Sequence, residues 1–243
     1  MRPPLQPALA DLLAYLGEMG YGDLYVAPAR AAAPAQAPAP LRQPAPAAAP
    51  VPLSGAAAER ASELAVLAGA AAGCTRCRLS EGRTQVVFGT GNPAAELMFV
   101  GEGPGAEEDR QGLPFVGAAG ELLNRIIQAI EKSRDEVYVA NVVKCRPPGN
   151  RDPQPDEVAA CRGYLDQQIA LVRPRVLVAL GRVAAQTLLG NDSPIGRLRG
   201  QWFKVQGIPT RVTYHPAALL RNPALKRPTW EDMQQVRDFL RSG

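Results

Sequence analysis

Short apolar runs alternate with stretches of helical periodicity over most of the chain after residue 56. Four runs, at residues 97–100, 137–140, 176–180 and 210–214, predict strands because they are dominated by aliphatic and β-branched side chains. Helical patterns cover residues 56–71, 117–131, 155–172, 183–189 and 230–241. Apolar strands separated by helices predict an α/β fold with a mostly parallel sheet, covered by helices on both faces.

The residues with the most suggestive chemistry follow the predicted strands. Glu102 and Gly103 come after the first strand and Asn141 after the second, while Gly181 and His215 follow the third and fourth. Ligands of parallel sheets bind at the loops beyond the carboxyl ends of the strands. The pattern therefore predicts one site at this rim of the sheet.

The first 55 residues have a different character. Leucines at helical spacing predict one short helix within residues 5–17, whereas residues 27–53 are almost entirely Ala and Pro and hold 8 of the 24 prolines. Such a composition cannot bury a core and is typical of an extended tether. We therefore expect a short helical segment at 1–26, a disordered linker at 27–55 and one globular domain at 56–243. The first segment is either a frayed tail or a docking segment for a partner protein.

Composition and charge give limited information about the partner and the location of the protein. The chain has 243 residues, of which 46% are hydrophobic, and a formal net charge of +4, which favours an anionic partner without identifying it. It has no apolar run of the roughly 18 residues that a membrane span needs, and no apolar core of a signal peptide. We expect a soluble, cytoplasmic monomer with no membrane partner.

The cysteines indicate a metal site. The chain has four, Cys74 and Cys77 in a C-x-x-C pair and Cys145 and Cys161 farther along. In an intracellular protein, metal ligation is favoured over disulfides. Zinc sites usually have two tight pairs or cysteine–histidine mixtures, so the wide second pair slightly favours an iron–sulphur cluster and leaves zinc open. Basic residues beside these cysteines, such as Lys144, offset thiolate charge or face phosphates.

Several segments together resemble the family 4 uracil-DNA glycosylases. They are residues 101–109, 114–117, 141–148 and 215–219, and the similarity extends from about residue 74 to residue 240, with all four cysteines in order. The resemblance implies a three-layer α/β/α sandwich with a central four-stranded, mostly parallel sheet and a structural [4Fe-4S] cluster on the cysteines. It also implies an enzyme of base excision repair that acts on uracil-containing DNA, single- or double-stranded, and leaves an abasic site.

The resemblance assigns roles to the residues at the rim. Phe115 corresponds to the residue that stacks on the flipped uracil, His215 to the one that contacts uracil O2, and Leu219 to the wedge that fills the vacated base stack. Asn141 is suited to reading uracil, because a side-chain amide can donate to O4 and accept from N3–H, whereas cytosine would leave buried polar groups unpaired. Without the resemblance, Phe115 would be interpreted as a core aromatic and Asn141 as a turn residue.

The carboxylates are harder to assign. The best-known uracil glycosylases have an aspartate that orients water where this chain has Gly103. The resemblance suggests Glu102 near the water and Glu108 near uracil C5, where it would exclude the methyl group of thymine. Asn150 resembles a residue at the rim of the active site, with a plain turn as the alternative.

Three other functions fit parts of the sequence. A glycosylase that bonds covalently to DNA through a histidine in an inserted loop is disfavoured, because no histidine lies between Asn141 and Cys161. A non-enzymatic DNA-binding domain that is stabilised by a bound metal would account for the charge and the cysteines. It would not account for Phe115, Asn141 and His215 at one rim of the sheet. A glycosylase of the same fold for other deaminated bases, such as hypoxanthine, stays open, although Asn141 favours uracil.

Overall fold

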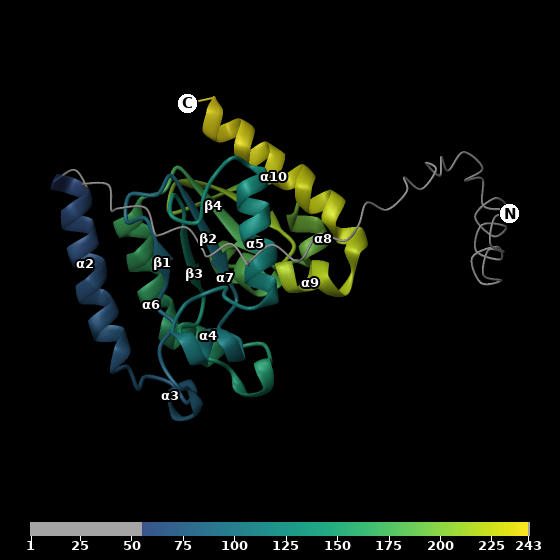
Figure 1. Ribbon diagram of the computed structural model, residues 1–243. Helices are drawn as coiled ribbons and strands as arrows, with labels where there is room; N and C mark the ends of the chain where they lie inside the picture. The colour runs from purple at the N-terminus through teal and green to yellow at the C-terminus, as the bar shows by residue number, and fades with distance from the viewer. Residues whose placement is uncertain (1–54, 243) are drawn as a thin grey trace, which may run out of the picture. The chain divides into compact units, whose positions relative to one another are not determined.

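The computed structural model describes residues 55–242, and Figure 1 shows their course. The predicted N-terminal helix, nearly all of the predicted linker and the docking role of the first segment lie outside this part of the chain. Helix α2 begins at Gly55, one residue before the predicted start of the globular domain. No helix in the described residues is long and apolar enough to cross a membrane.

One six-stranded sheet forms the centre, in the order β1-β3-β2-β4-β6-β5. The four inner strands, β3, β2, β4 and β6, run parallel, which confirms the predicted parallel core. The two edge strands pair antiparallel with their neighbours. The strands are β1 (Thr90–Gly91), β2 (Leu97–Gly101), β3 (Tyr138–Asn141), β4 (Val176–Leu180), β5 (Trp202–Val205) and β6 (Ile208–Thr213).

The prediction of four strands was therefore short by two, both at the edges. Strand β1 has only two residues, too few for a periodic signal. Strand β5 joins β6 through Gln206 and Gly207, which both have positive φ, at 51° and 81°. Two such residues are typical of a tight hairpin turn, but Gln-Gly is a weaker sequence signal for that turn than Asn-Gly.

Helices connect the strands and cover both faces of the sheet. The longer ones agree with the predicted ranges to within a few residues. The helices are α2 (Gly55–Ala72), α3 (Leu79–Gly82), α4 (Ala106–Gln111), α5 (Ala118–Ala129), α6 (Pro155–Val172), α7 (Arg182–Leu189), α8 (Ile195–Leu198), α9 (Pro216–Arg221) and α10 (Lys226–Arg241), with 3-10 turns η1 (Pro148–Asn150) and η2 (Pro223–Leu225).

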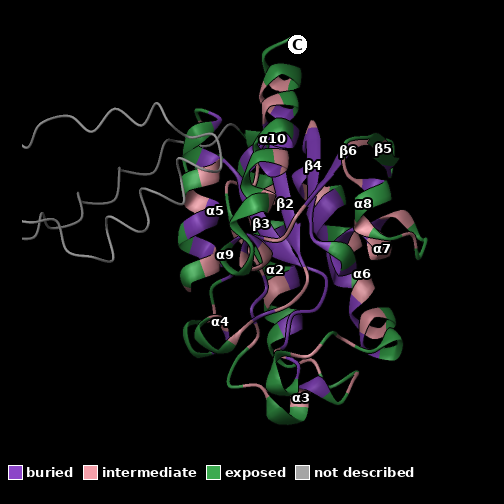
Figure 2. Cartoon of the chain, turned by 90° about the vertical axis from the view of Figure 1, so that its right-hand side faces the viewer, coloured by how far each residue is buried: buried purple, intermediate pink, exposed green. Residues whose placement is uncertain are grey.

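Two apolar layers hold the sandwich together, and Figure 2 shows the buried strands between the helices. Alternate side chains of each strand point to opposite faces. Phe99 and Val178 pack with α5 and α10 on one face, while Val100 and Ala179 pack with α6 and α7 on the other. Helix α2 lies outside α6 and joins the second layer (Figure 1). The three-layer α/β/α prediction is confirmed.

The connections place a crevice at the carboxyl ends of the strands. The chain leaves β2 toward the face covered by α5, but it leaves β3 and β4 toward the face covered by α6 and α7. Where neighbouring strands send their connections to opposite faces, the loops separate and leave room for a ligand.

Candidate active site

A cavity of about 380 Å³ opens at this rim. Residues that follow β2, β3 and β6 line it, as the strand-end pattern predicted. Strand β4 contributes indirectly, because Arg182, the second residue after β4, pairs with Asp152 of the lining. The predicted site residues in the lining are Glu102, Gly103, Glu108, Phe115, Asn141, Asn150 and His215.

Phe115 is held in a strained conformation at the cavity wall. Its φ is 57°, in the left-handed region, where a bulky residue costs about 1–3 kcal/mol. The side chain is nearly buried, and its ring centroid lies 5.5 Å from that of His215. The ring thus offers an apolar surface beside the only imidazole of the chain.

Glu108 braces the segment that carries Phe115. Its Oε1 accepts hydrogen bonds from the backbone N–H groups of Val116 and Gly117 at 3.0 and 3.1 Å. Its Oε2 accepts one from Gly105 at 3.1 Å, which caps the start of α4. Glu108 was predicted to lie near uracil C5 and exclude the methyl group of thymine, and it does line the cavity. The structure adds a holding function, since three backbone donors occupy its carboxylate.

Asn141 presents a buried amide at the end of β3. The side chain is 1% exposed, and its Oδ1 has no hydrogen-bond partner. Gly101 makes this arrangement possible, because a Cβ there would lie 2.4 Å from that Oδ1 and 2.6 Å from the Phe115 ring. An unpaired buried acceptor is costly, and one in a cavity wall is available to a donor from a ligand or from water.

His215 is neutral and its tautomer is fixed. Burial, assisted by the charge of Arg221, lowers its pKa to about 4, although Glu108 opposes this. Its Nδ1 accepts a hydrogen bond from the N–H of Ala217 at 3.2 Å, so that His215 caps α9. The ring proton therefore sits on Nε2, which makes His215 a donor without charge.

Glu102 is a carboxyl with a raised pKa. Burial and the nearby carboxylate of Asp152 raise the pKa to about 7, although the charge of Arg182 opposes the rise. A group that titrates near neutral pH can both accept and release a proton under working conditions. Glu102 thus has the properties that handling a water molecule requires.

The remaining predicted site residues are Gly103, Asn150 and Leu219, of which the first two line the cavity and the third does not. Gly103 leaves space beside Val143, whose Cγ2 would lie 2.8 Å from a Cβ at that position. Asn150 lies at the rim with φ of 54°, and its Oδ1 accepts a hydrogen bond from Arg146 at 2.8 Å. Leu219 was predicted as a wedge, but it is 2% exposed and lies outside the cavity lining. Its helix turns it into the core.

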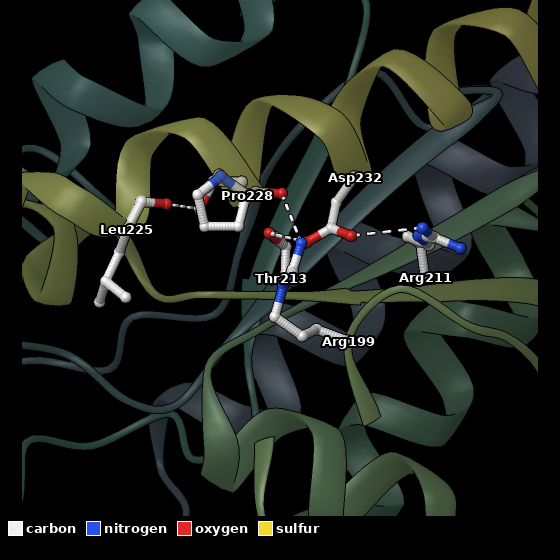
Figure 3. A network of polar contacts seen from close by, with 7 residues as sticks. Arg199, Arg211, Thr213, Leu225, Pro228 and Asp232 are labelled. Atoms are coloured by element: carbon white, nitrogen blue, oxygen red, sulfur yellow. Dashed lines mark hydrogen bonds and ion pairs between the residues drawn. The ribbon is translucent and has the colours of Figure 1, made fainter. Parts of the chain in front are cut away.

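A buried network holds the strand that leads to His215 (Figure 3). Asp232 of α10 accepts a hydrogen bond from the Thr213 hydroxyl at 2.9 Å and forms ion pairs with Arg199 and Arg211 at 3.2 Å. Thr213 is the last residue of β6, two before His215. The network therefore ties the end of this strand to the C-terminal helix.

The four cysteines meet at a second, smaller cavity. Cys74 and Cys77 lie between α2 and α3, Cys145 lies after β3, and Cys161 lies in α6, yet all four line the same hollow. None forms a disulfide. Among the described residues, no three His, Cys, Asp or Glu side chains have the spacing for a single metal ion.

Positive charge surrounds these thiols. Arg76 donates to Cys74 Sγ and Arg83 donates to Cys145 Sγ, both at 3.4 Å. Lys144 borders the same hollow but is 2% exposed, so it cannot face a phosphate. Its Nζ donates to the backbone oxygen of Asn141 at 2.7 Å, and burial lowers its pKa to about 8.

Sequence reasoning missed Asp152 as a lining residue. It follows Asn150 in what reads as an ordinary turn, and it lies thirty positions before Arg182 along the chain. The only available signal was that Arg182 follows a predicted strand end.

Comparison with known proteins identifies the family. The profile of the uracil DNA glycosylase superfamily matches residues 88–234. The type-4 uracil-DNA glycosylase of Sulfurisphaera tokodaii is 47% identical over 175 residues, which cover 68% of this chain and 80% of that protein. That of Thermotoga maritima is 44% identical over 69% of this chain and 90% of its own length. A type-5 uracil-DNA glycosylase of Thermus thermophilus is 36% identical over 43% of this chain and 54% of its own. This chain therefore belongs to the type-4 uracil-DNA glycosylases of the uracil DNA glycosylase superfamily.

Proposed function

We propose that the cavity receives a uracil flipped out of DNA and that its residues hydrolyse the N-glycosidic bond, leaving an abasic site. The observation that carries the proposal is the buried amide of Asn141, which has an unpaired acceptor in the wall of the cavity. Enzymes that act on a base in DNA must take it out of the stack and read its edge in a pocket.

Asn141 selects the base in this proposal. Its Oδ1 accepts from uracil N3–H and its amide nitrogen donates to O4. Cytosine presents an acceptor and a donor at these positions, and would leave both partners unpaired at a cost of about 1–3 kcal/mol each. The Phe115 ring stacks on the base, and Glu108 keeps that ring in place through its three backbone hydrogen bonds.

His215 stabilises the leaving group. As the bond between C1′ and N1 breaks, its electron pair passes into the uracil ring and negative charge builds on O2. The Nε2–H of His215 donates to that oxygen. A donor that is held in place before the reaction stabilises the transition state more than the ground state. Glu102 orients the water that attacks C1′.

A neighbour of Leu219 is better placed to fill the space that the flipped base leaves in the DNA. Leu220 is 45% exposed, next to the buried Leu219 on α9. We assign to Leu220 the filling of the space that the flipped base leaves, because its side chain is already exposed, whereas that of Leu219 is buried.

The test of the function is incubation with an oligonucleotide that contains one uracil, followed by alkali. We expect strand cleavage at the uracil, on a single- or double-stranded substrate. Matched oligonucleotides with cytosine or thymine at the same position should stay intact, and one with hypoxanthine tests whether the specificity extends to other deaminated bases. If no abasic site forms on either uracil substrate, the enzymatic function is wrong.

We further propose that the four cysteines hold a [4Fe-4S] cluster. Each thiolate of such a cluster binds a different iron, so its ligands spread around a shared hollow instead of converging on one ion. Four free thiols around one cavity, with Arg76 and Arg83 donating to two of the sulphurs, fit this ligand set. When bound, the cluster would link the segment after α2 to the loop after β3 and to α6.

We predict about four iron atoms per chain and a visible absorbance band in anaerobically purified protein. Cys161→Ser should lose most of the band, because a ligand is removed. Ser80→Ala is the matched control, since Ser80 borders the same hollow but donates only to the backbone oxygen of Cys77 and not to a sulphur. Stoichiometric zinc without iron in the anaerobic protein would exclude the cluster.

A further inference from the structure

Asp152 stands beside Glu102 at the edge of the active-site cavity. Both residues line that cavity, and the Asp152 carboxylate is one of the groups that raise the pKa of Glu102. The environments of the two differ. Glu102 is partly buried, whereas the side chain of Asp152 is 60% exposed and forms an ion pair with Arg182.

The backbone around Asp152 is anchored, so its position is not that of a loose surface loop. Arg151 forms two hydrogen bonds with the fully buried carboxylate of Glu157, at 2.7 and 2.8 Å. It also donates to the backbone oxygen of Asp152 at 2.9 Å. Glu157 in turn accepts from the N–H of Gln154 at 2.7 Å at the start of α6. These contacts fix the turn, and Arg182 then fixes the side chain.

Asp152 also lines a hollow outside the active-site cavity. Together with Arg182 it lines a third hollow of about 720 Å³, the outer hollow, which is open to solvent. Glu102 is absent from the lining of that hollow. Asp152 thus lines both the active-site cavity and the solvent-open hollow outside it.

We infer that Asp152 is a second carboxylate of the hydrolytic step, which receives the water proton from Glu102 and releases it to solvent through the outer hollow. The inference rests on the proposed function. As the C1′–N1 bond breaks, its electron pair leaves with uracil, and the water oxygen bonds to C1′. The proton of that water passes to Glu102 and then to Asp152, which returns it to solvent. No other reactant is needed.

The arrangement has a pH signature. Glu102 acts as a carboxylate, so the rate of uracil release should rise with pH through its pKa of about 7, which burial and Asp152 raise and Arg182 opposes. The other charged residues of the cavity are Glu108, Arg151, His215 and Arg221. Burial lowers the pKa of His215 to about 4, so His215 does not contribute to a rise near pH 7.

The test compares pH profiles of the single-turnover rate in the cluster-containing full chain. Asp152→Asn removes a negative charge beside Glu102, so the pKa of Glu102 falls and the rise should move by roughly 0.5–1 pH unit to lower pH. The plateau rate should fall about tenfold, less than the roughly 100-fold that loss of a general base causes. Arg182→Gln should move the rise the opposite way. Asp152→Glu should restore most of the plateau rate.

The control is Asp192→Asn, which removes a negative charge from the outer hollow alone and should leave the profile unchanged. An unmoved rise in Asp152→Asn, or a shift in the same direction for Asp152→Asn and Arg182→Gln, would overturn the inference. If either of these outcomes is found and the unmodified protein does release uracil, only the inference about Asp152 fails. If the unmodified protein releases none, the proposed function fails first.

Discussion

Replacing His215 by asparagine is expected to slow uracil release by about 100- to 1,000-fold, while the affinity for uracil-containing DNA changes less than about threefold. The imidazole is neutral, and its Nδ1 is occupied by the N–H of Ala217, so Nε2–H is the group that meets the charge on the departing base. That contact strengthens only as the bond breaks. Its loss therefore lowers the rate of the chemical step much more than substrate binding.

Asparagine is chosen because it is a good N-cap and can keep the hydrogen bond to Ala217 that begins α9. His215→Ala loses that cap as well, at about 1 kcal/mol of stability, so equal rates for the two variants would assign the loss of rate to the imidazole and not to the helix. The rise in rate near pH 7 should persist in both, since it belongs to Glu102. Equal losses of rate and of DNA affinity would contradict the role of His215.

The fold was predictable where the sequence is periodic. The ranges of β2, β4 and α6 agreed with their patterns because fully buried strands and long helices depend on local apolar spacing. Strand β5 was not predicted because it has only four residues, of which Trp202 and Lys204 are exposed, so its apolar run is too short to stand out. Only its pairing with β6, which the chain sets up through a tight turn, makes it a strand.

The site was predictable where a side chain directly follows a strand. Asn141 and His215 are fixed by the sheet, so their convergence follows from topology. The position of Asp152 and the holding function of Glu108 depend on contacts between a helix and a distant loop, which no local pattern encodes. The wedge role of Leu219 stays a prediction, since the motif gives the residue and the structure shows only that this leucine is buried beside the exposed Leu220.

Replacing Asp232 by asparagine is expected to lower the free energy of unfolding by about 3–5 kcal/mol. Asp232 and Arg211 are each 1% exposed in their side chains, and the carboxylate is the ion-pair partner of that guanidinium (Figure 3). Two nitrogens of Arg211 already lack hydrogen bonds. Without Asp232, the guanidinium would be a buried charge with no counter-charge. Arg199, 20% exposed, can turn toward water instead. Urea unfolding of the cluster-containing protein measures the change in unfolding free energy. The two proteins are compared with the same slope of free energy against urea concentration.

Two further variants test whether the loss of stability comes from the unpaired charge of Arg211 or from any change of charge on α10. Glu231→Gln removes the neighbouring carboxylate, whose pair with Arg227 is exposed, and should cost less than about 0.5 kcal/mol. Adding Arg211→Met to Asp232→Asn removes the unpaired charge, so it should recover at least about half of the lost stability. If the double variant is less stable than Asp232→Asn alone, the loss arises from packing and not from charge. Because Thr213 also bonds Asp232, the single variant should loosen the end of β6, and uracil release should fall even at temperatures where the chain stays folded.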